Sequence, residues 1–436
     1  MDLSSIHPVS PIDENHLLYG NFIGLQYVFT QSLNSKILNQ AISVLADQFP
    51  ALTGRYVARS GSIEIKSNDV SLKVRQAKGS INDVLTLLER PNYIAEPMRQ
   101  DVLRGRAPLS TFTLTEFEDG GAILGVAISH LLTDAAGYHL LLAHLGEIYT
   151  RLKKAEPPPS FPFHTRLGEF DFGTDQSKAE VLKSLQQRNL PKPIPIKGLV
   201  GKAIKSLIIK AMDKSLSENI PVLIKFTPDD IARLKATVLI ESGEDWISTN
   251  MALCAHFTAL IAKLSYQDEI KADMQIGQLL DLRNRYFEDI SNTQSQFVGN
   301  AILIHIDKAS FPDSLQNTSR GALAQYFKNR QSRTDATDVK TRLNLLSDCL
   351  RHGYTNPELD VKNPIISLNN QSKMNIYDIA FDEQIPKRIY PQDVGDNIMF
   401  FPASDGGVEI YIRDIVNPQG QRKLLLPEWQ ARIFDF

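Results

Sequence analysis

The sequence contains very little cysteine. Its two cysteines, Cys254 and Cys349, stand far apart among 436 residues, without the spacing of a metal or redox site. Isolated thiols of this kind are typical of proteins from a reducing compartment. The first residues also lack a basic stretch followed by an apolar one, which is the pattern of a secretory signal. We therefore expect a cytoplasmic protein with neither a disulfide framework nor a cysteine-based metal centre.

Long apolar runs and an excess of one charge are missing as well. No stretch approaches the ~18 uninterrupted apolar residues of a membrane-spanning helix. The net charge of −3 gives no electrostatic reason to expect nucleic acid. Residues 198–212 combine an apolar helical face with several lysines, a pattern of membrane-surface helices and, more often, of helices that cover their own core. We therefore expect neither a membrane nor a nucleic acid as partner.

The composition is that of a globular protein, with 42% apolar and 22% charged residues, and the length exceeds what one ordinary core supports. Proline-rich stretches at 155–168 and 191–198 interrupt the middle of the chain. We predict a first domain over residues 1–185, a linker over 186–217 and a second domain over 218–436. In both domains strand patterns alternate with helical ones, which predicts the α/β class, with mixed β-sheets flanked by helices.

Apolar periodicity and turn residues predict the individual elements. Strands are expected at 22–29, 110–117, 120–128, 273–283 and 297–306, with a further strand pair around a turn at 404–407. Helices are expected after an N-cap at Asn34 or Ser35, after an N-cap at Thr133 or Asp134, and over residues 248–264. The strand at 120–128 is apolar on both faces, which suits a central position in its sheet.

One histidine, His130, follows the strand at 120–128, and Asp134 comes four residues later. The pair could be part of a metal site, a catalytic base with its orienting acid, or a structural histidine at a helix start. A zinc site needs three or four ligands, and no nearby cysteine, aspartate or glutamate cluster supplies the others. No G-x-S-x-G elbow precedes the histidine, which argues against a serine-hydrolase triad. The spacing alone leaves the catalytic and the structural role open.

Further motifs occur in a fixed order around this pair. They are LNQAISVLADQFPALTGRY at 38–56, GAILGVAISHLLTDAAG at 121–137, DLRNR at 281–285, FVGNAI at 297–302 and NIMFFPASDGGVEIYI at 397–412. Their order resembles that of the H-x-x-x-D acyltransferases known as the BAHD family. The family's loop is usually H-x-x-x-D-G-x-G; here Ala135 replaces the first glycine, and Gly137 keeps the second.

The resemblance implies a fold, an activity and substrates. BAHD members share the two-domain architecture of chloramphenicol acetyltransferase, with an active-site channel at the domain interface, and a segment near 365–390 can cross to the first domain. They move acyl groups from coenzyme A thioesters to alcohols or amines. We therefore expect a monomeric acyltransferase that uses acyl-CoA as co-substrate, holds no permanent cofactor or metal, and acts on a small secondary metabolite. Two alternatives stay open: acyl transfer from a carrier-protein thioester, and a non-catalytic relative that binds a small molecule.

The resemblance also implies roles for particular residues. His130 would be the general base, and Asp134 would support the site by pairing with an arginine of the DLRNR segment, in the first place Arg283. Candidates for substrate binding or oxyanion stabilisation are Asn369, Asn370 and Ser372, and candidates for coenzyme A binding are Ser248, Thr249 and Asn300.

A second family motif, D-F-G-W-G-K-P, is largely lost. Residues 380–386 occupy its place without a gap, and only Phe381 and Pro386 survive. In the family this segment is architectural and lies away from the substrates. We therefore expect Asp378 or Asp382 to compensate for the loss with an interdomain ion pair or a capping contact, and Phe381 to remain buried.

Overall fold

The chain forms two compact units. The computed structural model describes residues 6–9, 13, 22–57, 62–65, 70–87, 92–161, 174, 176–195, 221–266, 275–283, 297–308, 317–358, 365–392, 398–413 and 420–436. Unit 1 comprises Met1–Asp171, Arg283–Ala301 and Met374–Asp393, and unit 2 comprises Phe172–Leu282, Ile302–Lys373 and Val394–Phe436. Two short segments from the second half of the chain therefore belong to unit 1.

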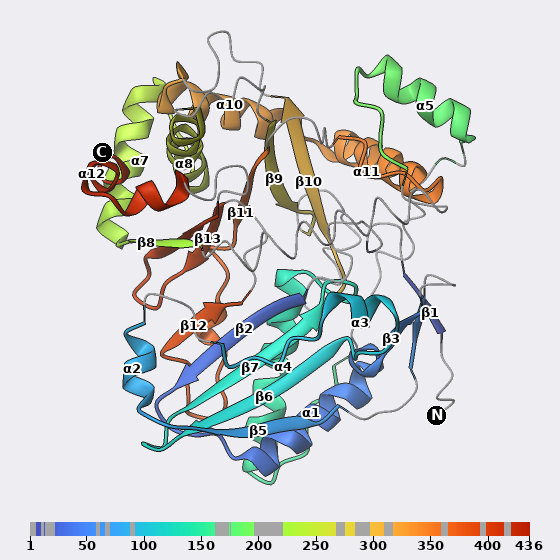
Figure 1. Ribbon diagram of the computed structural model, residues 1–436, viewed down its shortest axis with the longest axis vertical. Coiled ribbons are helices and arrows are strands. Elements are labelled where there is room, and N and C mark those ends of the chain that lie inside the picture. Colours follow the sequence, from blue (N-terminus) through green and yellow to red (C-terminus); the bar gives the residue numbers. More distant parts are fainter. Residues whose placement is uncertain are drawn as a thin grey trace. The chain divides into compact units, whose positions relative to one another are not determined.

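Unit 1 is built on a five-stranded mixed sheet (Figure 1). Its strands, in spatial order, are β12 (Arg388–Pro391), β2 (Phe22–Phe29), β7 (Ala122–Ser129), β6 (Ser110–Phe117) and β5 (Leu72–Ala77). β5 and β6 are parallel, and the other neighbours are antiparallel. Every residue of β7 is buried, which agrees with its unbroken apolar sequence and its central position.

Two long helices of unit 1, α1 (Ser35–Gln48) and α4 (Ala135–Lys153), pack against each other. Both begin at a predicted N-cap: the side chain of Asn34 accepts from two backbone N–H groups of α1, and that of Asp134 accepts from Gly137 N–H. Shorter elements of unit 1 are an antiparallel sheet of β1 (Ile6–Pro8), β4 (Ser62–Glu64) and β3 (Arg55–Val57), the helices α2 (Ile81–Leu85) and α3 (Arg99–Leu103), and the 3-10 turns η1 (Pro50–Thr53) and η4 (Ile376–Asp378).

Unit 2 has a six-stranded mixed sheet. Its strands, in spatial order, are β10 (Ile302–Lys308), β9 (Gln275–Asp281), β11 (Ile365–Asn370), β13 (Ile398–Pro402), β14 (Val408–Ile412) and β8 (Val222–Phe226). β11 is parallel to both of its neighbours, and the remaining pairs are antiparallel. The hairpin of β13 and β14 turns where the sequence predicted it, and the mixed sheets of both units confirm the expected α/β class.

Helices of unit 2 share one apolar core with its sheet. They are α7 (Pro228–Ser242), α8 (Thr249–Tyr266), α10 (Arg320–Arg333) and α12 (Pro427–Ile433), joined by the 3-10 turn η5 (Gly420–Leu425). α8 is the central helix of this layer, because it is buried along nearly its whole length. A smaller apolar cluster joins α5 (Lys178–Gln187) to α11 (Ala336–Arg351) and encloses Cys349.

One predicted strand was wrong in part. The apolar pattern at 297–306 reads as a single strand, but regular pairing begins only at Ile302. The preceding residues use their backbone groups elsewhere: Gly299 O accepts from Arg283, and Ala301 N–H donates to Asp134. Because those groups are already bonded to side chains, they are not available to a neighbouring strand.

The division of the chain differs in detail from the predicted domains. α5 begins within residues 1–185, yet it packs on α11 in unit 2. Most of the predicted linker and all of 198–212 lie outside the described residues, so the linker bounds and the packing of that segment stay predictions. Met374–Asp393 belongs to unit 1, in the region near 365–390 for which a crossing was expected.

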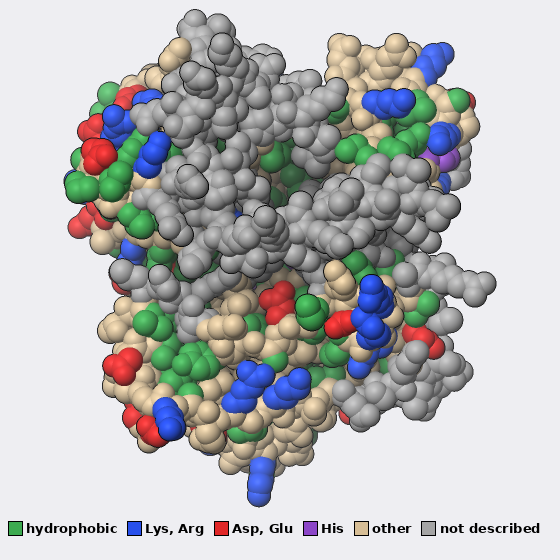
Figure 2. All heavy atoms as spheres, viewed as in Figure 1, with side chains coloured by type: hydrophobic (Ala, Val, Ile, Leu, Met, Phe, Trp, Pro, Cys, Tyr) green, Lys and Arg blue, Asp and Glu red, His purple; other side chains and the backbone are tan. Residues whose placement is uncertain are grey.

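No helix among the described residues is long and apolar enough to cross a membrane. The face of unit 1 seen in Figure 2 carries Lys and Arg side chains (blue) interspersed with Asp, Glu and apolar ones. This mixture agrees with the nearly balanced totals of 47 basic and 50 acidic residues.

Candidate active site

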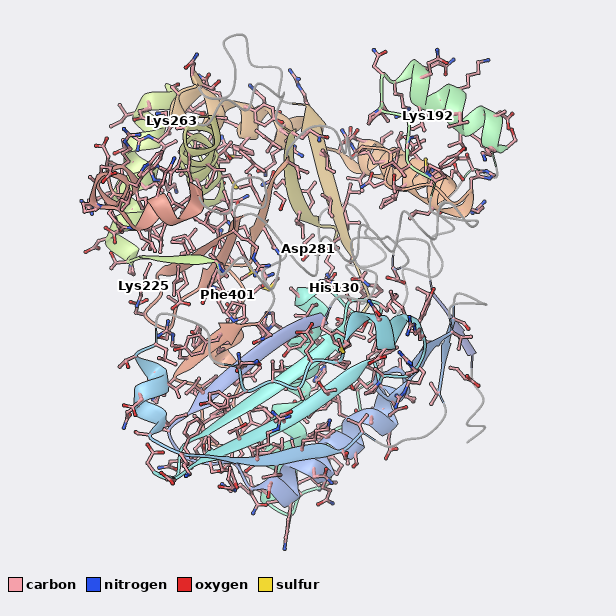
Figure 3. The ribbon with its side chains drawn as sticks, viewed as in Figure 1. His130, Lys192, Lys225, Lys263, Asp281 and Phe401 are labelled. Carbon is pink, nitrogen blue, oxygen red and sulfur yellow. The ribbon has the colours of Figure 1, made fainter. Side chains whose placement is uncertain are left out.

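His130 lies one residue beyond the C-terminal end of β7 (Figure 3). Ser129 turns the backbone at this point, since its Oγ accepts from Leu131 N–H at 3.3 Å and its carbonyl from Leu132 N–H at 2.9 Å. The carbonyl oxygen of His130 accepts from Asn300 Nδ2 at 2.7 Å. The partly buried histidine is therefore held by a central strand on one side and by a distant side chain on the other.

Asp134 caps α4 and is 1% exposed. Its Oδ1 accepts from Gly137 N–H at 3.0 Å and from Arg283 Nη2 at 3.0 Å, and its Oδ2 accepts from Arg283 Nη1 at 2.8 Å and from Ala301 N–H at 2.7 Å. Each carboxylate oxygen thus accepts two hydrogen bonds. A buried carboxylate with its acceptor sites occupied in this way stabilises the loop and is not available to take a proton from a substrate.

Arg283, the predicted partner of Asp134, is 7% exposed. Besides its two bonds to Asp134, its Nη2 donates to Gly299 O at 2.7 Å, and its guanidinium lies 5.2 Å from the centre of the Phe297 ring. A buried cation needs such pairing because its desolvation is costly. The structure brings together two residues that stand 149 positions apart, while Arg285 of the same segment lies outside the described residues.

Gly137 allows the loop and the segment at 297–301 to come close. A Cβ atom at this position would overlap with the carbonyl oxygen of Val298 and with Thr133 Oγ1. A helix normally prefers alanine to glycine, so a glycine in the first turn of α4 is explained by this approach and not by helix propensity. The glycine that survives from the family's loop pattern is therefore the one that this contact requires.

The degenerate segment Ala380–Pro386 docks on α4 of the same unit. Phe381 is fully buried and meets the rings of Phe29 and Tyr149 edge-on, at centroid distances of 5.8 and 5.7 Å. A Cβ at Gly146 of α4 would overlap with the carbonyl oxygen of Ala380. The burial of Phe381 agrees with the architectural role expected for this segment.

Asp382 stands where the lost motif has its first glycine, and its φ of 61° lies in the left-handed region that favours glycine. Aspartate tolerates this left-handed region better than most residues. Its N–H donates to Thr150 Oγ1 at 2.7 Å, and its carboxylate pairs with Lys153 at 2.8 Å. The hydrogen bond from Lys153 holds the pKa of Asp382 below its ordinary value. The sequence led us to expect an interdomain ion pair or a capping contact from Asp378 or Asp382. The ion pair of Asp382 with Lys153 lies within unit 1, so the expected interdomain pair is wrong for Asp382.

The oxyanion and coenzyme A candidates of unit 2 lie next to each other. Ser248 caps α8, with its Oγ accepting from Met251 N–H at 3.1 Å, and Thr249 is the first residue of that helix. One residue further on, Asn250 accepts through Oδ1 from Asn370 Nδ2 at 2.7 Å. The N-terminal turn of α8 and the C-terminal end of β11 are therefore joined by a contact between two carboxamides.

Ser372 completes this polar cluster. Its N–H and its hydroxyl donate to Asn370 Oδ1 at 2.9 and 2.6 Å, and Asn369 is partly buried beside them at the end of β11. Asn250 was not among the residues predicted from the sequence, although its position in the first turn of α8, two residues after Ser248, was a signal for it. The third coenzyme A candidate, Asn300, belongs to unit 1, is 4% exposed and has its amide nitrogen bonded internally.

Another histidine of α4, His139, lines a pocket of about 400 Å³ in unit 1 together with Arg283 and Asp378. Burial lowers the pKa of His139 to about 3, against the opposing effect of the negative charge of Asp134. His139 is therefore neutral in the folded protein at neutral pH. Among the described residues, no group of three or more His, Cys, Asp or Glu side chains could hold a metal ion.

Comparison with known sequences identifies related proteins. A model of the Transferase family matches residues 3–413. Rosmarinate synthase from Plectranthus scutellarioides is 29% identical over 160 residues, which are 36% of this chain and 33% of that protein. The match thus spans about a third of the length of this curated relative.

Comparison with solved structures gives matches over nearly the whole chain. TRI101 of F. sporotrichioides, crystallised with coenzyme A and T-2, has a TM-score of 0.70 at 15% identity, with 98% of each chain covered. Vinorine synthase has a TM-score of 0.67 at 15% identity, with 98% of this chain and 94% of that chain covered. These likenesses confirm the fold expected from the resemblance of the sequence.

Proposed function

Because the chain belongs to the Transferase family, as its resemblance to the BAHD acyltransferases predicted, we propose that it transfers an acyl group from a coenzyme A thioester to a hydroxyl or amine of a small secondary metabolite. The similarity to rosmarinate synthase and to vinorine synthase supports acyl transfer. The complex of TRI101 with coenzyme A supports acyl-CoA as the co-substrate. A cytoplasmic location, a monomeric state and a channel between the domains stay predictions from the sequence.

The observation that carries this proposal is the hydrogen bonding of Asp134, which leaves His130 as the candidate proton acceptor. Both oxygens of Asp134 are occupied by internal donors, so its carboxylate cannot serve as the proton acceptor. His130 is then the titratable side chain of the motif that can do so. Its position at the end of a rigid strand suits a group that must be held in place during the reaction.

The chemistry follows from the needs of thioester cleavage. As the acceptor oxygen or nitrogen forms a bond to the carbonyl carbon, it must lose a proton, and a neutral imidazole with a pKa near ambient pH takes that proton efficiently. Collapse of the tetrahedral intermediate breaks the carbon–sulfur bond. The proton on His130 then passes to the departing sulfur, so that free coenzyme A leaves as a thiol and the histidine is neutral again.

We assign two supporting roles to the polar cluster of unit 2. The amides of Asn369 and Asn370 would stabilise the oxyanion of the intermediate. Ser372, whose N–H and hydroxyl are both bonded to Asn370 Oδ1, would hold the Asn370 amide in place. Ser248 and Thr249, at the N-terminus of α8, would receive the pantetheine or a phosphate of coenzyme A. The bond between Asn250 and Asn370 supports a joint role, because it links the two groups of residues directly.

The experiment is a thioester panel without acceptor. The protein is incubated with acetyl-, malonyl-, aromatic and long-chain CoA, and slow hydrolysis is followed by mass spectrometry. We expect at least one thioester to be cleaved faster than in buffer, because water can replace the acceptor in a site built for attack on the carbonyl. Binding of a thioester with no turnover by water or by any acceptor tested would favour a non-catalytic relative, and no binding at all would contradict coenzyme A as co-substrate.

A further inference from the structure

Asn300 joins His130 to the N-terminal part of the chain. Its Nδ2 donates to the backbone carbonyl of His130 at 2.7 Å and to Asp13 Oδ1 at 2.8 Å. The side chain is 4% exposed, so neither bond competes freely with water. All three residues belong to unit 1, although they come from three distant parts of the sequence.

The two acceptors determine the orientation of the Asn300 amide. A carbonyl oxygen and a carboxylate can only accept, so the nitrogen end of the amide must face them. A reversed amide would place oxygen against oxygen at both contacts. The amide oxygen, Oδ1, is buried and has no hydrogen-bond partner among the described residues, which is an unfavourable arrangement by itself. Both donor bonds are therefore made at the cost of an unsatisfied acceptor.

The neighbours of Asn300 bind the other end of the same loop. Gly299 O accepts from Arg283, which also pairs with Asp134, and Ala301 N–H donates to Asp134 Oδ2. Three consecutive residues thus hold the loop at His130 and at Asp134. Asp134 is fixed mainly by charge, whereas the bond from Asn300 to His130 is made by a neutral amide.

We propose that Asn300 is a positioning residue for His130, and that Asp13 keeps the Asn300 amide in the orientation this requires. The inference rests on the proposed function and replaces the direct role in coenzyme A binding that the sequence suggested for Asn300. Fixing the carbonyl of His130 fixes the peptide plane that follows it, and with it the direction in which the imidazole leaves the backbone. A displacement of a reacting group by about 1 Å can lower a rate about 100-fold.

The first measurement does not depend on turnover. Diethyl pyrocarbonate modifies accessible neutral imidazoles, and peptide mass spectrometry gives the rate at His130 separately from the other histidines. We expect Asn300→Ala to raise the rate at His130 severalfold, because the residue loses its anchor and becomes more accessible. Asn300→Asp should do the same, since it keeps the size of the side chain and replaces the donor with an acceptor. Unchanged rates at His130 in both variants would overturn the proposal.

Two substitutions of Asp13 test the hydrogen bond between Asn300 Nδ2 and Asp13 Oδ1. Asp13→Asn keeps an acceptor oxygen for Asn300, so the modification rate at His130 should stay near that of the protein without substitutions. Asp13→Ala removes the acceptor and should reproduce part of the effect of Asn300→Ala. An equal effect of the two Asp13 variants would show that the acceptor oxygen is not what matters there.

Asn356→Ala is the matched control. Asn356 is also buried, at 3% exposure, and its Oδ1 accepts from Glu358 N–H at 2.9 Å in unit 2. Its loss should lower the melting temperature without changing the rate at His130. An equal rise of the modification rate at His130 in this control would mean that a general loss of stability, and not the loss of the Asn300–His130 hydrogen bond, explains the result.

Turnover with the thioester selected by the panel completes the test. Asn300→Ala should lower kcat about 10- to 100-fold and leave KM for the thioester within about twofold. A rise in KM with unchanged kcat would instead favour the direct role in coenzyme A binding. The two hypotheses can fail separately. Full turnover in His130→Ala would refute His130 as the general base. An unchanged modification rate at His130 in the Asn300 variants would refute Asn300 as its positioning residue.

Discussion

The guanidinium of Arg283 binds both carboxylate oxygens of Asp134, at 2.8 and 3.0 Å, in a place where the two side chains are 7% and 1% exposed. Two planar groups in this bidentate arrangement have one favourable geometry, so the pair fixes a direction as well as a distance. Asp134 is also the N-cap of α4, and Arg283 also holds Gly299. The pair therefore fastens a helix start and a distant segment to the loop that carries His130.

The ion pair should behave as a coupled unit. Asp134→Ala and Arg283→Ala should each lower the free energy of unfolding by about 3–5 kcal/mol, because each leaves a buried charge without its partner. The double variant should be little worse than either single variant, since the second change removes a charge that is already uncompensated. Chemical denaturation of the four proteins measures this cycle.

An exposed pair provides the control for that cycle. Arg106 and Asp101 lie 2.5 Å apart, with side chains that are 58% and 36% exposed. Arg106→Ala should change the free energy of unfolding by less than about 1 kcal/mol, as is usual for surface pairs. If the losses at Asp134 and Arg283 were strictly additive, the account of a coupled pair would be wrong.

The two positions of the family's loop glycines should differ in their dependence on glycine. Gly137→Ala should destabilise the protein despite the higher helix propensity of alanine, because the new Cβ would overlap with Val298 O and Thr133 Oγ1. Ala135→Gly restores the family pattern at the first residue of α4 and should cost no more than about 1 kcal/mol. Thermal unfolding compares the two variants. A Gly137→Ala protein with a melting temperature at or above that of the unmodified chain would show that the close approach is not required.

Asp382 contributes both a backbone conformation and a charge, and three variants separate them. Asp382→Gly restores the residue of the lost motif and suits the φ of 61°, so its melting temperature should stay close to that of the unmodified protein. Asp382→Ala forces an unfavourable residue into the left-handed region and should have the lowest melting temperature of the three. Lys153→Ala removes only the ion pair and should have a small effect. The reverse order, with Lys153→Ala lowest, would mean that charge outweighs conformation here.

Acid should destabilise the protein through His139. Its folded pKa of about 3 lies below its ordinary value of 6.5, so between these pH values the unfolded chain binds a proton at His139 and the folded protein does not. Stability should therefore fall as the pH is lowered below 6.5, by about 2 kcal/mol between pH 7 and pH 5 from this residue alone. His139→Gln should remove that part of the difference in denaturation curves recorded at the two pH values. An unchanged pH dependence in the variant would show that His139 is not held neutral by burial.

Local pattern was sufficient to predict most elements of the fold. β2 occupies 22–29 as predicted, because an apolar run there is bounded by polar residues, and α1 begins after Asn34 because a short polar side chain caps it. The strand predicted at 297–306 failed at its first half, since apolar pattern says nothing about which partner takes the backbone groups. In this case Arg283 and Asp134 take them.

The candidate site also contains contacts that local sequence pattern does not predict. His130 and Asp134 could be found because they stand four residues apart, and the pairing with Arg283 was anticipated only through the order of family motifs. The contacts of Asn300 with Asp13 and of Asn250 with Asn370 join residues that are 287 and 120 positions apart. No periodicity along a single chain encodes such pairs, so they depend on the tertiary structure.

The most direct test of the proposed function is the turnover of His130→Ala with the thioester that the panel selects. General base catalysis is worth about 10²–10⁴ in rate, and loss of the imidazole leaves the bond from Asn300 to the His130 carbonyl in place. We predict that kcat falls at least about 100-fold, while the melting temperature and the affinity for coenzyme A stay close to those of the unmodified protein. A variant that folds normally and retains more than about a tenth of the original rate would show that His130 is not the base.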